Sequence, residues 1–116
     1  MKLYDSELNI MEFLWRKKEA TAKEIAAEMA ETVGWSKTTT YTVLKKCVEK
    51  GAVKRQEPGF HCTPLISMEQ VQAYETRELI DKLYGGAADQ LVASLLGQQL
   101  SAGEIGKLKQ LIQELD

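Results

Sequence analysis

The chain has 116 residues, of which 44% are hydrophobic and 28% charged, so it can form one compact domain or a small domain with an appended assembly segment. No apolar run approaches the roughly 18 residues that a membrane span needs, and the start MKLYDSELN lacks the charged-then-apolar pattern of a signal peptide. We therefore expect a cytoplasmic protein that does not associate with membranes, and the net charge of -2 argues against indiscriminate coating of nucleic acid.

Two helices are predicted before residue 33. Ser6 is the expected cap of the first helix, which ends near Lys17 and Lys18, where cations suit the negative end of the helix dipole. Thr21 and Glu24 form a capping box that opens the second helix. Apolar positions repeat at helical spacing, on Leu8, Met11, Leu14 and Trp15 in the first helix and on Ile25, Ala26 and Met29 in the second.

A third helix is predicted between a Ser36 cap and Gly51, the glycine expected just after a helix end. Its inner face is mostly apolar and consists of Thr40, Val43, Leu44, Cys47 and Val48. Its outer face carries hydroxyl groups and cations instead of mixed charges, with Thr38, Thr42 and Lys45 at its centre and Thr39, Tyr41 and Lys46 on its flanks.

An alternating pattern replaces the helical one after Gly51. AVKRQE and FHCTP flank the turn signal Pro58-Gly59, which predicts a two-stranded hairpin carrying Lys54 and Arg55. Three short helices followed by a hairpin is the order of a winged helix-turn-helix domain. We therefore expect a mainly α fold with a small β-hairpin wing, in which residues 1–66 form a DNA-binding domain.

Amphipathic helices are predicted in the rest of the chain. A capping box at Ser67 opens a helix that runs to about Tyr84, a second helix follows Gly85-Gly86, and a capping box at Ser101 opens a third. Each helix is too short to be stable alone, so we expect residues 67–116 to form a helical dimerisation domain, with an intrachain cap on the winged domain as the alternative. The residues expected in the dimer contact are Leu79, Leu83, Leu91, Val92, Leu95, Leu108, Leu111, Ile112 and Leu115.

Positive charge coincides with the third helix and the hairpin. Residues 1–65 hold eleven cationic and nine acidic side chains, whereas residues 66–116 hold four cationic and eight acidic ones. Within residues 34–65 the cations outnumber the acids by six to two. A local excess of this kind indicates a surface for an anionic partner.

The outer face of the third helix has the chemistry of a contact with the DNA major groove. Threonine offers a hydroxyl to base edges or phosphates and a methyl to thymine, Tyr41 adds a planar surface, and lysines suit phosphates. Ser36, Lys37 and the free N–H groups of the first turn make an anion site for a backbone phosphate. In the hairpin, Lys54 and Arg55 are placed for a neighbouring phosphate or the minor groove.

Other interpretations remain open at this point. A threonine-rich first turn with outer lysines also occurs on solvated helices, and a winged helix can serve as a protein-interaction module. Cys47 and Cys62 are expected as two reduced, partly buried thiols, with a thiol-sensing regulator as the alternative. His61 beside Cys62 is incomplete for zinc, so no metal or other cofactor is expected. With one histidine and no paired carboxylate or nucleophile constellation, the sequence does not indicate an enzyme.

Three stretches of sequence resemble one known family along essentially the whole chain. They are W-S-x-x-T-x-x-T-x-L-x-K-x-x-x-K-G at residues 35–51, S-E-L-x-I-M-x-x-L-W at residues 6–15, and the Tyr84-Gly85-Gly86 junction followed by Leu91-Val92. They are similar to the penicillinase and methicillin-resistance repressor family (BlaI/MecI/CopY). The resemblance implies a homodimeric winged-helix repressor that binds a palindromic double-stranded DNA operator with TACA/TGTA-like half-sites.

The resemblance also implies roles for particular residues. Lys37 and Thr38 stand where the best-known members have proline and lysine, and Tyr41 stands where they have arginine, so the preferred operator can differ. In the beta-lactam repressors a regulatory protease cuts an Asn-Phe bond, which aligns with Ser94-Leu95 here, and the copper-responsive branch has C-x-C motifs that this chain lacks after Cys62. Carried over by position, the DNA contacts are Ser36, Lys37, Thr38, Thr39, Tyr41, Thr42 and Lys46.

Overall fold

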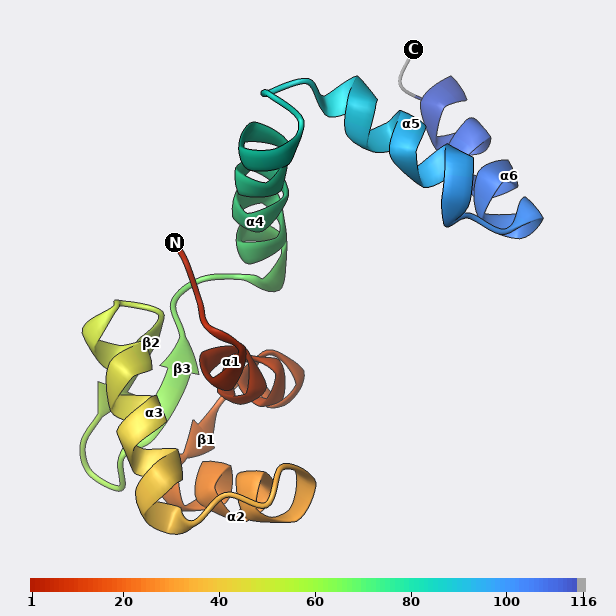
Figure 1. Cartoon of the computed structure of the whole chain (residues 1–116). Coiled ribbons are helices and arrows are strands. Elements are labelled where there is room, and N and C mark those ends of the chain that lie inside the picture. Colours follow the sequence, from red (N-terminus) through yellow and green to blue (C-terminus); the bar gives the residue numbers. More distant parts are fainter. Residues whose placement is uncertain (115–116) are drawn as a thin grey trace. The chain divides into compact units, whose positions relative to one another are not determined.

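The computed structural model describes residues 1–114, apart from the side chain of Gln98, and forms two compact units, Met1–Tyr74 and Glu75–Asp116. The structure confirms a mainly helical fold with a small antiparallel sheet (Figure 1). Along the chain, the boundary between the two units falls within the fourth helix. The expected division into residues 1–66 and 67–116 assigns functions to the two segments, and it stays a prediction. The elements are α1 (Asp5–Lys17), β1 (Ala20–Thr21), α2 (Ala22–Thr32), α3 (Lys37–Glu49), β2 (Val53–Gln56), β3 (His61–Pro64), α4 (Met68–Leu83), α5 (Ala88–Gln98) and α6 (Ala102–Gln113).

Helix α1 begins at Asp5, with Tyr4 as its N-cap, so the prediction that Ser6 caps this helix was wrong. The Tyr4 backbone N–H donates to Glu7 Oε1 at 2.7 Å, and this bond closes the first turn. Ser6 has Asn9 three residues later, whereas Tyr4 has Glu7 at that spacing, and a glutamate there can reach back to the cap. The capping glutamate therefore decides where the helix starts.

The core of the first unit lies between the three N-terminal helices and the sheet. The predicted inner faces are confirmed for α2 and α3, with Val48 half-buried against the core. In α1 the predicted stripe is confirmed in part. Met11 and Leu14 are buried and Leu8 and Trp15 are half-buried, while Ile10 and Phe13, outside the predicted stripe, are buried as well. Thr40 is fully buried, and its hydroxyl donates to the Ser36 carbonyl at 3.1 Å, so its burial leaves no unmet donor.

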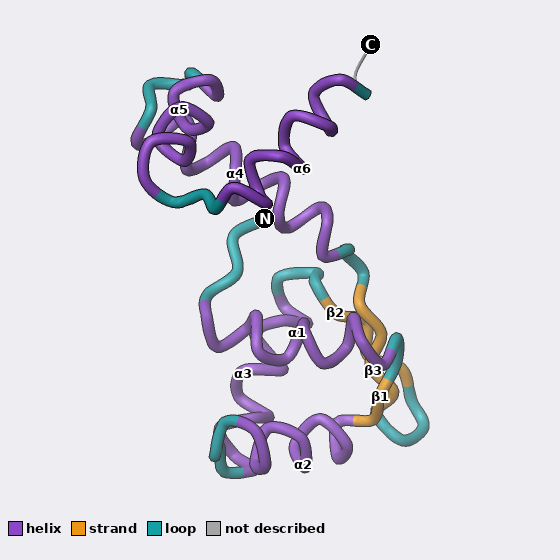
Figure 2. Tube along the Cα trace, turned by 90° about the vertical axis from the view of Figure 1, so that its right-hand side faces the viewer, coloured by secondary structure: helices purple, strands orange, loops and turns teal. Residues whose placement is uncertain are grey.

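The sheet has three antiparallel strands in the order β1-β3-β2 (Figure 2). The predicted hairpin is β2 and β3, in which Lys54 pairs with Thr63 and Arg55 with Cys62. The structure adds a third strand that the sequence did not predict, because Ala20 and Thr21 pair with β3. Two residues are too few to show an alternating pattern in the sequence. This short strand attaches the wing to the start of α2.

One ion pair joins the beginning of α1 to the end of α3. Lys50 Nζ lies 2.6 Å from Glu7 Oε1, and the Glu7 side chain is 1% exposed. Lys50 also donates to the Lys2 carbonyl at 3.0 Å and lies 4.3 Å from the centre of the Tyr4 ring. Glu7 Oε2 has no hydrogen-bond partner among the described residues, so Lys50 carries much of the compensation for this buried carboxylate.

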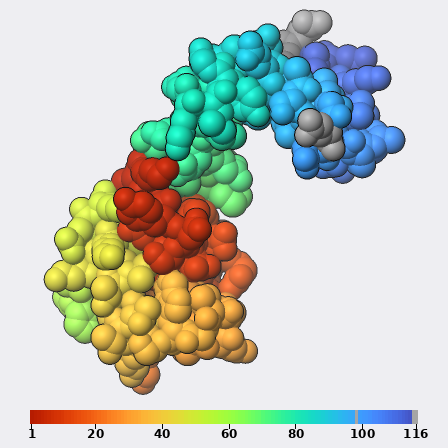
Figure 3. Space-filling model, viewed as in Figure 1, coloured from red at the N-terminus to blue at the C-terminus, as the bar shows by residue number. Residues whose placement is uncertain are grey.

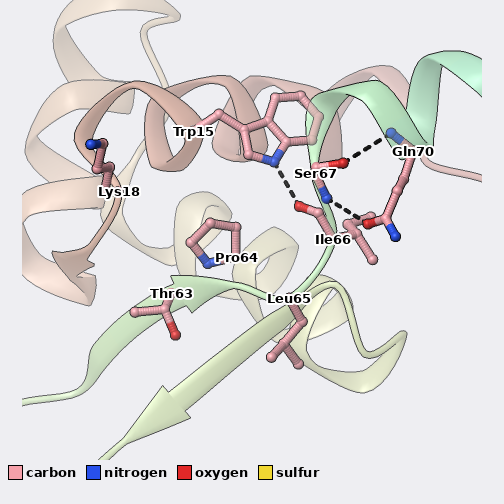
Figure 4. A pocket seen from close by; sticks show the side chains of 8 residues that line it. All are labelled: Trp15, Lys18, Thr63, Pro64, Leu65, Ile66, Ser67 and Gln70. Atoms are coloured by element: carbon pink, nitrogen blue, oxygen red, sulfur yellow. Dashed lines mark hydrogen bonds between the residues drawn. The ribbon is translucent and has the colours of Figure 1, made fainter.

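The segment between β3 and α4 is held against α1. Trp15 Nε1 donates to the Ile66 carbonyl at 2.9 Å, next to a cavity of about 430 Å³ (Figure 4). The predicted capping box at Ser67 is confirmed, since its N–H and hydroxyl bond Gln70 at 2.8 and 3.0 Å. The start of α4 is thereby fixed by hydrogen bonds on both sides of Ser67.

In the second unit, the predicted capping box of α6 is confirmed by two hydrogen bonds between Ser101 and Glu104, at 3.0 and 3.2 Å. The Ser101 backbone N–H donates to Glu104 Oε1, and the Glu104 backbone N–H donates to Ser101 Oγ. Hydrogen bonding of the Glu104 carboxylate with the Ser101 backbone and side chain lowers the pKa of Glu104. Leu83, Leu111 and Ile112 are 63%, 60% and 54% exposed. Among the described residues, none of the helices combines the length and apolarity that crossing a membrane requires.

Candidate nucleic-acid interface

Helix α3 begins with a hydroxyl cap. The Thr39 backbone N–H donates to Ser36 Oγ at 3.1 Å, and the Ser36 hydroxyl in turn donates to Thr39 Oγ1 at 3.0 Å. This arrangement sets the direction of the first turn and leaves the neighbouring backbone N–H groups facing outward with Lys37 beside them. The start of α3 therefore has the donors and the charge that bind a phosphate.

The outer face of α3 is exposed, as the sequence predicts. Tyr41 is 40% exposed, and Thr40 on the opposite side is fully buried. The Thr42 hydroxyl donates to the Thr38 carbonyl at 2.9 Å, so its oxygen keeps lone pairs for an external donor and its methyl group remains available. Figure 3 shows this part of the chain in yellow at the surface of the first unit. The exposed members of the predicted set on this helix are Lys37, Thr38, Thr39, Tyr41, Thr42, Lys45 and Lys46.

The wing places two predicted cations beside α3. Lys54 and Arg55 are both exposed on β2, and the Arg55 guanidinium lies 5.3 Å from the centre of the Phe60 ring. Phe60 itself is 48% exposed at the tip of the wing and was not among the predicted contacts. An aromatic residue next to a turn gives no signal by itself, because its position depends on how the hairpin folds.

A groove of about 760 Å³ separates α3 from the wing. Tyr41 and Lys45 line it from α3, Arg55 lines it from β2, and Lys23 lines it from the first turn of α2. The structure therefore brings together members of the predicted set from both elements. Lys23 also lines this groove and was not among the predicted contacts, because no local pattern links it to residues eighteen or more positions away.

The two cysteines are both buried, Cys47 in α3 and Cys62 in β3. Burial raises the pKa of the Cys47 thiol from 9.0 to about 12, and the nearby Glu7 carboxylate adds to the shift. Burial also raises the pKa of Cys62. Both thiols are thus protonated at neutral pH, which is the unreactive form. Within residues 1–114, no three histidine, cysteine, aspartate or glutamate side chains gather closely enough to hold a metal ion.

We expect iodoacetamide to label Cys47 in the folded protein on the order of 10³-fold more slowly than in denaturant at neutral pH, because the raised pKa leaves so little thiolate. Since the folded pKa exceeds 9.0, the neutral thiol stabilises the fold below that pH, and this contribution is lost as the pH rises toward 12. Mass spectrometry of the labelled peptides measures both rates. Equal rates in the folded and denatured protein would favour the thiol-sensing alternative.

Comparisons with known proteins agree with this architecture. A sequence model of the penicillinase repressor family matches residues 3–114. The penicillinase repressor of Bacillus licheniformis is 28% identical over 97% of this chain and 91% of its own, and the methicillin resistance regulatory protein MecI of Staphylococcus aureus is 25% identical over 96% and 93%. The solution structure of the DNA-binding domain of the repressor BlaI has a TM-score of 0.55 at 30% identity, covering 58% of this chain and 84% of that one. The chain belongs to the penicillinase repressor family, a family of DNA-binding transcriptional repressors.

Proposed function

We propose that this protein is a dimeric transcriptional repressor that places α3 in the major groove of a palindromic operator. The observation that carries the proposal is the division of α3 into a buried apolar face and an exposed face of hydroxyl groups and lysines. The relatives named as repressors, and the BlaI domain named as DNA-binding, support the same function. An α-helix fits the major groove, where base edges and thymine methyl groups are accessible.

Each exposed group of α3 has a role that its chemistry suits. Thr38 and Thr42 lie at the centre of the face and contact base edges or thymine methyl groups, and Tyr41 contacts bases from the flank. Lys45 and Lys46 neutralise phosphates, since lysine carries a charge on a flexible stem and gives little base discrimination. Around them, the phosphate contacts at the helix start and the wing come from Ser36, Lys37, Thr39, Lys54 and Arg55.

Dimerisation is supported by apolar side chains of the second unit that one chain leaves exposed. Leu95 is 37% exposed, Leu111 60% and Ile112 54%. Covering such side chains contributes roughly 1.5–3 kcal/mol for each one that becomes fully buried, so several from each subunit can offset the cost of association. Two recognition helices about 34 Å apart then meet successive turns of the same duplex face. The residues predicted to form the dimer contact are Leu79, Leu83, Leu91, Val92, Leu95, Leu108, Leu111, Ile112 and Leu115. Of these, Leu115 lies outside the described residues.

Induction by a regulatory protease is a further part of the proposal, carried over from the family resemblance. The bond that would be cut, Ser94-Leu95, lies inside α5, and both residues are exposed. A protease needs an extended backbone, so the helix must open locally before cleavage. Cutting α5 would remove α6 and its exposed apolar side chains from the dimer contact.

Fluorescence anisotropy tests the proposed function. The protein is titrated into a labelled palindromic duplex with TACA/TGTA half-sites and into a scrambled duplex of the same composition, at several salt concentrations. We expect submicromolar binding to the palindrome that weakens as salt rises, because counterions are released from the neutralised phosphates. No salt-dependent binding to either duplex would contradict the proposal.

Lys46→Ala is expected to weaken binding to both duplexes by a similar factor. The loss of one phosphate contact should reduce the slope of log Kd against log salt by about 1. Lys17→Ala is the matched control, because Lys17 is also an exposed lysine in the last turn of a helix, α1, and is not in the predicted set. A slope of log Kd against log salt that is the same for Lys46→Ala and wild type would show that Lys46 does not contact a DNA phosphate.

A further inference from the structure

The groove between α3 and the wing has the size of a small-molecule site. Its volume of about 760 Å³ lies within the range of about 300–1,000 Å³ that is usual for ligand pockets. Leu44 and Val48 form an apolar floor from α3, and Ala22 adds to it from α2. Tyr41 and Phe60 contribute aromatic rings that are 40% and 48% exposed. The interior of the groove therefore suits a flat apolar body.

The walls of the groove are held in place without a ligand. The Ala22 backbone N–H donates to the Phe60 carbonyl at 3.0 Å, which ties the wing tip to the start of α2. Thr21 pairs with His61 directly after Phe60, and Arg55 stacks on the Phe60 ring. Phe60 has a φ of 51°, a left-handed conformation that bulky side chains rarely adopt. The Ala22 hydrogen bond, the Thr21–His61 pairing and the Arg55 contact hold Phe60 in this strained conformation at the edge of the groove. Strained backbone conformations are common at ligand sites.

The charges around the groove select an anion. Lys23, Lys45 and Arg55 line it with three cations, against the single acid Glu49. We propose that the groove binds an aromatic carboxylate, with its ring on the apolar floor and its carboxylate among the cations, and that this ligand lowers the affinity for DNA. The second part rests on the proposed function, because Tyr41, Lys45 and Arg55 belong to the predicted DNA contacts and cannot serve a ligand and a duplex together. The ligand would then act as an inducer.

Binding is measured by titrating 2-naphthoate into the ¹⁵N-labelled full chain, with the neutral 2-naphthylmethanol as the comparison probe. We expect a Kd of about 1 mM for 2-naphthoate, as suits a probe of this size. The amide shifts should concentrate at Leu44, Val48 and Phe60. The neutral probe should bind at least several-fold more weakly. Equal affinities for the two probes, or shifts away from these residues, would overturn the proposal.

Three charge variants distinguish a change in ligand binding at the groove from a general effect on folding. Arg55→Gln should weaken 2-naphthoate binding about tenfold, because a charge-assisted contact is lost. Glu49→Gln should strengthen it about twofold, because the repelling charge is removed. Arg16→Gln is the matched control, since Arg16 also lies over an aromatic ring, 5.5 Å from the centre of Phe13, but outside the groove. A loss of binding in Glu49→Gln as well as in Arg55→Gln would contradict the charge argument.

Anisotropy with the palindromic duplex tests the link to DNA. Saturating 2-naphthoate should raise the Kd for the duplex about tenfold in wild type, and the neutral probe should leave it unchanged. If the duplex binds but 2-naphthoate binds without changing the duplex Kd, the inference fails and the proposed function stands. If the probe binds and no duplex does, the proposed function fails. The ligand then has no DNA complex to dissociate and cannot be an inducer.

Discussion

Replacing two exposed apolar residues of α6 by aspartate, in the double variant Leu111→Asp/Ile112→Asp, is expected to dissociate the dimer and with it the operator complex. A dimer contact would bury four such side chains, two from each subunit. At about 1.5 kcal/mol each they contribute about 6 kcal/mol, which is on the order of 10⁴-fold in the dissociation constant. Sedimentation velocity measures the subunit equilibrium, and anisotropy measures the loss of affinity for the duplex.

Leu65→Asp is the matched control for this variant. Leu65 is 54% exposed, comparable to Leu111 and Ile112, but it lies in the first unit and outside the predicted dimer contact. The control should remain a dimer and bind the duplex as wild type does. A double variant that sediments as a dimer would contradict the assignment of α6 to the interface.

Lys50→Met is expected to lower the free energy of unfolding by about 3 kcal/mol, the cost of leaving a buried carboxylate without its cation. Glu7 is 1% exposed and its Oε2 already lacks a hydrogen-bond partner among the described residues, so without Lys50 the carboxylate keeps the bond from the Tyr4 N–H to Oε1 but loses its countercharge. Methionine keeps most of the length and the apolar stem of lysine, which limits the loss of packing. Urea unfolding followed by circular dichroism measures the change.

Two further variants show whether the effect comes from the ion pair. Arg16→Met breaks a second pair, Arg16 to Glu28 at 3.0 Å, in which the arginine is 64% exposed, and it should cost less than about 1 kcal/mol. Glu7→Met/Lys50→Met removes both charges of the pair and should recover part of the stability lost in Lys50→Met, because the cap bond from the Tyr4 N–H is lost together with Glu7. A double variant as unstable as the single one would show that the loss is not due to the unpaired carboxylate.

Local signals in the sequence predicted most of the helices. The boxes at Thr21, Ser67 and Ser101 marked where α2, α4 and α6 start, because a cap and its glutamate or glutamine are three residues apart and need no tertiary contact. The inner and outer faces of α3 were predicted from helical periodicity, which likewise is a property of the local sequence and needs no tertiary contact. Tyr4 was missed as a cap because its own side chain gives no capping signal, and only Glu7 marks the position.

The features that the sequence did not predict depend on contacts between distant segments. Strand β1 exists because Ala20 and Thr21 meet β3 some forty residues later, and the Glu7–Lys50 pair joins residues 43 positions apart. The groove needs α2, α3 and the wing in their folded positions before its residues face one another. The predicted DNA contacts were easier to identify, because most of them lie on one face of one helix.

Lysine footprinting tests the central claim, that the outer face of α3 lies against DNA, most directly. The protein is acetylated briefly with and without the palindromic duplex, and the modification of each lysine is measured by mass spectrometry. We predict that the duplex protects Lys37, Lys45, Lys46 and Lys54 and leaves Lys17, Lys107 and Lys109 unchanged. Protection confined to Lys107 and Lys109, with Lys45 and Lys46 as reactive as in the free protein, would contradict the claim.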